Sequence, residues 1–245
     1  MAKLTSRIEN RRIAMLIDGD NAQPSLAGKM LVETGKYGLV TIRRAYGDWT
    51  TPNMSGWKDT LQTDAIQPIQ QFRYTTGKNA TDSAMIIDAM DILYEGAVEG
   101  FCLVSSDSDY TRLATRIREK GFFVMGIGKK TTPKAFVNAC NVFVYVENLT
   151  TDLPAPGLAK PQKKAEAAEQ AAADPLPLLM SAFEMAQQED GQAILAMVGQ
   201  HLRQLDPSFD SRTYGYKQLS LLIKAYPKVF SMKGDTIRYA EGKAG

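Results

Sequence analysis

The sequence predicts two domains: an α/β domain built on a parallel sheet, and a smaller domain with a winged-helix pattern. Over roughly the first 150 residues, short apolar runs alternate with amphipathic stretches, which is typical of a parallel sheet covered by helices on both faces. In the last 70 residues or so, three helical stretches precede two short strands. A segment rich in Ala, Pro, Lys and Glu separates the two patterns, so we place the domain boundary there.

The first domain is expected to hold six strands, because each run is short, apolar and bounded by polar or turn-forming residues. These runs are Ile13–Ile17, Leu39–Arg44, Ile69–Tyr74, Phe101–Val104, Phe122–Ile127 and Val142–Val146. Apolar side chains at helical spacing predict the helices between them. The helices are expected at Ser25–Thr34, Ser55–Ala65, Asp82–Tyr94, Asp109–Lys120 and, approximately, 133–139.

The second domain is expected to begin with two amphipathic helices, Leu178–Gln187 and Ala193–Leu205. A turn-rich stretch follows, then a third helix at Tyr216–Ala225 and a small hairpin of Val229–Met232 and Thr236–Tyr239. The separating segment has no aromatic residue, so we expect a linker. The predicted ranges are 10–149 for the first domain, 150–175 for the linker and 176–241 for the second domain.

Composition limits where the protein works and how it binds its partners. Lys and Arg number 29 against 27 Asp and Glu, so any nucleic-acid site must come from local charge placement. Cys102 and Cys140 lie in apolar sequence, which predicts reduced core thiols. No apolar stretch approaches the roughly 18 residues of a membrane span, and the N-terminal residues resemble no signal peptide. We therefore expect a cytoplasmic protein with no membrane partner. Its oligomeric state is not predicted, and a homo-oligomer is compatible with the sequence.

The histidine content excludes two kinds of active site. The chain has a single histidine, His201, so two-histidine acid–base chemistry and His-rich zinc sites are excluded. An enzyme with this composition is expected to use carboxylates and a hard cation such as Mg²⁺.

Carboxylates follow two of the predicted strands. Asp18 and Asp20 come directly after the first strand, and Asp107 and Asp109 come just after the fourth. Side chains at the carboxyl ends of neighbouring parallel strands meet where the strand order reverses, so we expect these four to converge if the strands are adjacent. Asp82 is expected in the first turn of a helix, behind an N-cap at Thr81, and could project over the same edge. Taken singly, each is better explained as a turn or capping residue than as a metal ligand. Their combination favours a Mg²⁺ or Mn²⁺ site.

Such a site suits hydrolysis of phosphodiester bonds, because the cation activates water and neutralises phosphate charge. Nearby cations that could hold phosphate are Arg43, Arg44, Lys78, Lys129 and Lys130, although for Arg43 and Lys130 a solvated surface charge is the better explanation. Ser105, Ser106 and Ser108 could bond to metal waters or phosphate.

Four separated motifs, IAMLIDGDN, YGDW, KNATDSAMIID and SSDSDY, resemble the NYN domain, a branch of the PIN-like nucleases, over roughly residues 10–148. The resemblance implies a Rossmann-like three-layer sheet and metal-dependent ribonuclease chemistry. It assigns the catalytic and metal-binding carboxylates to Asp18, Asp82, Asp107 and Asp109. It gives supporting positions to Asp20, Asn21, Asp48 and Asp88. The family usually has SGDSDF in the last motif, so Ser106 replaces Gly and Tyr110 replaces Phe, with the carboxylates intact.

The stretch LDPSFDSRTYGYKQLSLL resembles the LOTUS domain, also called OST-HTH, over about residues 176–241. The resemblance implies a small winged helix that binds RNA, with structured or G-rich RNA suggested for the family. A helix N-terminus can bind phosphate and tyrosine faces can stack on bases. The candidate RNA-binding residues of this domain are Arg212, Tyr214, Tyr216 and Lys217, with Lys233 and Arg238 on the wing. Phe209, Tyr214 and Leu219 can equally be core residues.

The sequence therefore predicts a metal-dependent endoribonuclease with a separate RNA-binding domain. Three alternatives stay open: a non-catalytic RNA-binding adaptor, a phosphohydrolase acting on small metabolites, and a LOTUS domain that binds protein. Against a haloacid-dehalogenase-type phosphohydrolase, Asn21 follows Asp20 where that family has Thr or Val. Against a Toprim-like enzyme, no glutamate-bearing strand precedes the late pair of aspartates.

Overall fold

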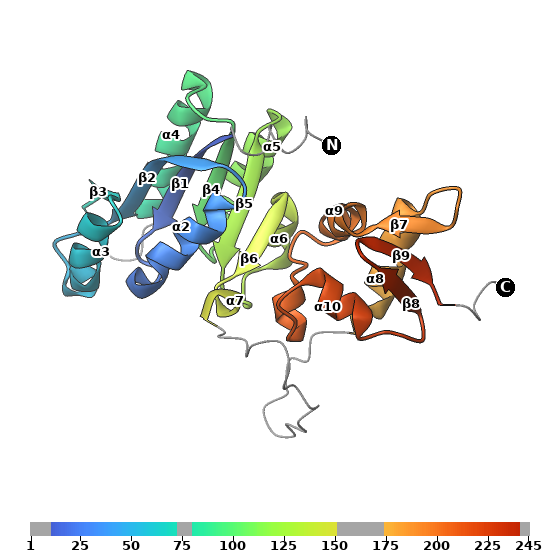
Figure 1. Cartoon of the computed structure of the whole chain (residues 1–245). Helices are drawn as coiled ribbons and strands as arrows, with labels where there is room; N and C mark the ends of the chain where they lie inside the picture. Colours follow the sequence, from blue (N-terminus) through green and yellow to red (C-terminus); the bar gives the residue numbers. More distant parts are fainter. Residues whose placement is uncertain (1–10, 73–79, 151–173, 241–245) are drawn as a thin grey trace. The chain divides into compact units, whose positions relative to one another are not determined.

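The computed structural model describes residues 11–72, 80–150 and 174–240 (Figure 1). The chain divides into two compact units, Met1–Thr150 and Thr151–Gly245. The predicted linker at 150–175 lies almost entirely outside the described residues.

The first unit is built on a six-stranded sheet in which every neighbouring pair is parallel. The strand order is β3-β2-β1-β4-β5-β6, so the order reverses between β1 and β4. This confirms the predicted α/β class. The strands are β1 (Arg12–Asp18), β2 (Leu39–Gly47), β3 (Gln67–Gln70), β4 (Gly100–Val104), β5 (Phe123–Gly128) and β6 (Val142–Tyr145).

Helices cover both faces of this sheet. Alternate residues of β1 point to opposite faces, which gives two cores: Ala14 and Leu16 join one, and Ile13, Met15 and Ile17 join the other. The first core receives residues of α4 (Ala80–Glu95), α5 (Thr111–Glu119) and α6 (Lys134–Ala139). The second receives residues of α2 (Ala27–Gly35), α3 (Lys58–Thr63) and α7 (Glu147–Thr150). In the described part of the chain, no helix has both the length and the apolar character that a membrane span requires.

The second unit combines helices with a three-stranded antiparallel sheet of order β7-β9-β8. Its core is formed by side chains such as Leu179, Phe183, Leu202 and Ile237. The elements are α8 (Leu176–Ala186), β7 (Gln192–Ile194), α9 (Leu195–Leu205), α10 (Leu219–Lys224), β8 (Phe230–Lys233) and β9 (Thr236–Tyr239). This is the winged-helix pattern that the sequence predicts, with one added strand.

Several elements differ from the prediction. Ala193 begins no helix, because it belongs to strand β7, where it pairs with Ile237 of β9 and is fully buried. The third helix begins at Leu219 rather than Tyr216, since Gln218 has an extended backbone. β3 ends at Gln70, and the last two residues of the predicted strand lie outside the described part. The short helix α7 was not predicted.

The two cysteines are buried and free, as expected for reduced core thiols. Burial raises the pKa of Cys102 to about 12, so this thiol stays protonated at neutral pH.

Candidate metal centre

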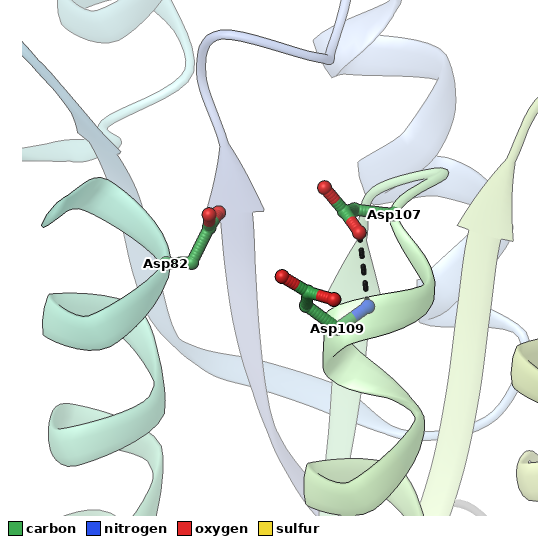
Figure 2. A group of neighbouring side chains, drawn as sticks. All are labelled: Asp82, Asp107 and Asp109. Carbon is green, nitrogen blue, oxygen red and sulfur yellow. Dashed lines mark hydrogen bonds between the residues drawn. The ribbon is translucent and has the colours of Figure 1, made fainter. Parts of the chain in front are cut away.

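Three of the predicted carboxylates come together at the carboxyl edge of the sheet. Oxygens of Asp82, Asp107 and Asp109 lie within 4.8 Å of one another (Figure 2). Asp82 lies in the first turn of α4, while Asp107 and Asp109 follow β4. Two oxygens on one Mg²⁺ at about 2.1 Å can be at most about 4.2 Å apart, so small side-chain rotations would close this group on an ion. The donor set therefore fits a hard divalent cation.

A tight turn holds two of these carboxylates. Asp107 has an extended backbone and caps the 3-10 turn Ser108–Tyr110. Its Oδ1 accepts a hydrogen bond from the backbone N–H of Asp109 at 2.9 Å, drawn as a dashed line in Figure 2. This bond fixes the two residues relative to each other before any ion binds.

Asp18 lies outside the group of three. Its side chain at the end of β1 is 1% exposed, and three donors surround it: Asn21 Nδ2 at 2.6 Å, Ser105 Oγ at 2.9 Å and the Asp20 N–H at 3.2 Å. Burial raises the pKa of Asp18, the bonds from Asn21 and Ser105 lower it, and the charges of Asp82 and Asp20 raise it further. Asp18 is thus close enough to interact with the group electrostatically.

Asp82 carries the clearest sign of electrostatic repulsion. Its pKa is raised, first by burial and then by the charges of Asp107, Asp109 and Asp20, while a hydrogen bond from Tyr110 opposes the rise. Keeping these carboxylates ionised together at neutral pH costs free energy, and a bound cation would offset that cost.

We expect divalent cations to stabilise the first unit more at pH 7.5 than at pH 5. The folded-state pKa values of Asp18 and Asp82 lie above their ordinary values, so the cost of ionisation is present above the folded pKa and is relieved as the pH falls through it. Protons also compete with the cation at low pH. At ten times its Kd, Mn²⁺ should add about 1.4 kcal/mol, or roughly 3–5 °C in Tm.

Thermal unfolding in Mn²⁺ and in EDTA at the two pH values checks this expectation. Asp82→Asn is the comparison variant and should lose the Mn²⁺-dependent gain. Equal Tm values in Mn²⁺ and EDTA at pH 7.5 would contradict the interpretation.

Ser105 connects the two strand ends. Its buried hydroxyl donates to Asp18 Oδ2 and accepts the Asp107 N–H at 3.1 Å. Because β1 and β4 are paired through Ile17 and Val104, Ser105 comes directly after the pair. It therefore holds the first acidic segment against the second.

Ser105→Ala is expected to lower the free energy of unfolding by about 1–3 kcal/mol, because the buried Asp18 carboxylate loses one donor and the partly buried Asp107 N–H loses its acceptor. We also expect any metal-dependent activity to fall about tenfold, the usual cost of removing a group that orients ligands. Urea unfolding and initial rates measure the two effects. Ser55→Ala, an exposed serine of the first unit outside the acidic loops, is the control. A rate equal to that of the unmodified protein would show that Ser105 does not organise the site.

The other acidic positions have different surroundings. Asp20 is exposed and accepts a bond from Thr81 Oγ1 at 3.3 Å. α4 begins at Ala80, so Thr81 lies inside the helix and is not the predicted N-cap. Asp48 Oδ1 accepts bonds from Thr50 and Gln70, so it fixes the loop after β2.

Asp88 faces β2 rather than the carboxylate group. It pairs with the guanidinium of Arg44 and accepts the hydroxyl of Tyr46. Arg44, which was predicted to bind phosphate, therefore forms an ion pair with Asp88. Arg43 donates to the backbone carbonyl of Asp64.

Two exposed lysines, Lys129 and Lys130, follow strand β5, which is the neighbour of β4 in the sheet. The backbone N–H of Lys129 donates to Ser106 Oγ at 2.9 Å, which ties the lysine turn to the acidic loop. The backbone N–H of Lys130 is capped by Glu147. Lys78, another predicted cation, lies outside the described residues.

The predicted RNA-binding residues of the second unit divide into two kinds. Arg212 forms an ion pair with Asp210, and Tyr214 packs near Phe209 with ring centroids 5.8 Å apart. Tyr216 also packs against the core. Lys217 and Lys233 are exposed. The helix α10 begins only at Leu219. The four candidates that were expected at its start therefore precede it and do not form its first turn: Arg212, Tyr214, Tyr216 and Lys217.

Sequence comparisons cover both units. The NYN domain family matches residues 12–147, and the OST-HTH/LOTUS domain family matches residues 167–238. No curated protein matches the chain.

Two solved structures are similar to parts of the chain. A protein of unknown function from Vibrio parahaemolyticus is 19% identical, with a TM-score of 0.48, covering 56% of this chain and 94% of its own. An uncharacterized protein from Nitrosomonas europaea is 34% identical, with a TM-score of 0.27, covering 34% of this chain and 89% of its own.

Proposed function

The chain belongs to the NYN domain family and carries a C-terminal OST-HTH/LOTUS domain, and from this premise we propose that it is a metal-dependent endoribonuclease. An NYN domain has a nuclease-type fold, and a LOTUS domain suggests RNA binding. The observation that carries the proposal is the group of Asp82, Asp107 and Asp109 at the point where strand order reverses.

Each part of the site has a separate role in this proposal. Asp82, Asp107 and Asp109 hold Mg²⁺ or Mn²⁺, which supplies an activated water and positive charge for the phosphate when bound. Asp18 adds negative charge near the group and is kept in place by Asn21 and Ser105. Lys129, exposed and linked to the acidic loop through Ser106, binds a phosphate next to the one that is cut.

The second unit holds the RNA. Its exposed cations Lys217 and Lys233 contact the phosphate backbone, and Tyr216 offers a face for a base. Because the cutting site and the binding domain share one chain, RNA bound to either is concentrated near the other. We place the protein in the cytoplasm, where its two buried thiols stay reduced.

The test is incubation of the full chain with a mixed pool of structured and unstructured RNAs in Mn²⁺, Mg²⁺ or EDTA. The proposal expects fragments in the presence of a cation and intact RNA in EDTA. RNA that stays intact under every condition while still binding the protein would instead identify an RNA-binding adaptor.

A further inference from the structure

The hydroxyl of Tyr110 makes a direct contact with the carboxylate group. It donates a hydrogen bond to Asp82 Oδ1 at 2.7 Å. Tyr110 is the last residue of the 3-10 turn that carries Asp109 and follows Asp107. The bond therefore links the helix that supplies one carboxylate to the turn that supplies the other two.

The ring of Tyr110 is held rigidly. It is 0% exposed, belongs to the core between α4, α5 and the sheet, and packs beside Phe136 with ring centroids 6.4 Å apart. A buried hydroxyl needs a hydrogen-bond partner, and a donor on an immobile ring can lie in one place only. Asp82, in contrast, is partly exposed and sits on the first turn of α4, where its side chain has other staggered rotamers available.

We propose that Tyr110 is a positioning residue that holds the Asp82 carboxylate toward Asp107 and Asp109 in the arrangement that binds a divalent cation. The inference rests on the proposed function, because it concerns the same cation site. Phe at this position would keep the ring but would have no hydroxyl for Asp82.

The first prediction concerns cation affinity. In Tyr110→Phe, the Kd for Mn²⁺ of the full chain without RNA should rise about tenfold, as for other groups that orient metal ligands. The loss of the electron paramagnetic resonance signal of free Mn²⁺ on binding measures this Kd without any RNA cleavage. The KM for RNA should be unchanged, and saturating Mn²⁺ should restore the cleavage rate to within about twofold, because the carboxylates themselves remain.

The chain offers a matched control, a second buried tyrosine whose hydroxyl bonds to an aspartate of α4. Tyr46 of β2 is also fully buried, and its hydroxyl donates to Asp88, which lies six residues after Asp82 on α4 and outside the group of three. Tyr46→Phe removes the same atom from a similar environment. It should leave the Kd for Mn²⁺ unchanged. Circular dichroism of both variants checks that each is folded.

The outcomes separate this inference from the proposed function. If the unmodified chain binds Mn²⁺ and Asp82→Asn weakens binding, but Tyr110→Phe does not, the positioning role is refuted and the cation site stands. Equal loss of affinity in Tyr110→Phe and Tyr46→Phe also refutes it, because the effect would then come from helix packing. If the unmodified chain binds no Mn²⁺, both the cation site and the positioning role fall.

Discussion

Asp107→Asn is expected to reduce metal-dependent RNA cleavage at least about a thousandfold, because several kcal/mol of transition-state stabilisation depend on a correctly held cation. Asn keeps an oxygen that can accept the Asp109 N–H, so the turn should survive while the negative charge is lost. The Kd for RNA should change by less than about threefold, since the second unit carries the main binding residues in this account.

Single-turnover cleavage and fluorescence anisotropy with the same labelled RNA measure the two quantities. Asp91→Asn is the matched control, because it removes an exposed carboxylate of α4 that is not part of the group of three. Cleavage should then be unchanged. Equal loss of cleavage and RNA binding in Asp107→Asn would contradict the proposal that the first unit cleaves RNA and the second unit binds it.

Removal of residues 176–245 is expected to raise the Kd for RNA at least about tenfold, while cleavage at saturating RNA stays within about threefold. The two units have separate hydrophobic cores, so the first is expected to stay folded with its carboxylates in place. The truncation removes Lys217, Lys233 and Tyr216, which are proposed to hold RNA.

Anisotropy titrations at several salt concentrations measure this effect. The double variant Lys217→Ala, Lys233→Ala in the full chain is the milder control, and it should reduce the slope of log Kd against log salt by about one to two. An unchanged affinity after truncation would show that the LOTUS domain does not hold the RNA, and would favour a protein partner for it.

The fold could be predicted because buried strands and helices have recognisable patterns of apolar residues in the sequence. IAMLI in β1 is apolar on both faces, which occurs when helices cover both sides of a parallel sheet. The meeting of Asp107 and Asp109 with the first helix turn of Asp82 also follows from topology, because carboxyl ends of strands share one edge. The backbone brings the three residues to this edge, and side-chain contacts such as that of Tyr110 then orient their carboxylates.

Side-chain partners could not be predicted in the same way. Whether Asp18 joins the group or is surrounded by Asn21 and Ser105 depends on rotamers and contacts between distant segments. The pairing of Arg44 with Asp88 depends on how α4 lies over β2, which no spacing rule gives. For the proposed positioning of Asp82 by Tyr110, the sequence offers one indication: an aromatic residue with a hydroxyl lies next to an acidic motif.

In the proposed function, a cation bound by Asp82, Asp107 and Asp109 drives RNA cleavage. A Mn²⁺ titration of one protein sample, followed both by bound Mn²⁺ and by RNA fragments, would show whether the two are linked. We expect binding and cleavage to reach half their maxima at the same Mn²⁺ concentration, and both to disappear in Asp107→Asn. Cleavage that persists in EDTA, or that survives in a variant that no longer binds Mn²⁺, would contradict this proposal.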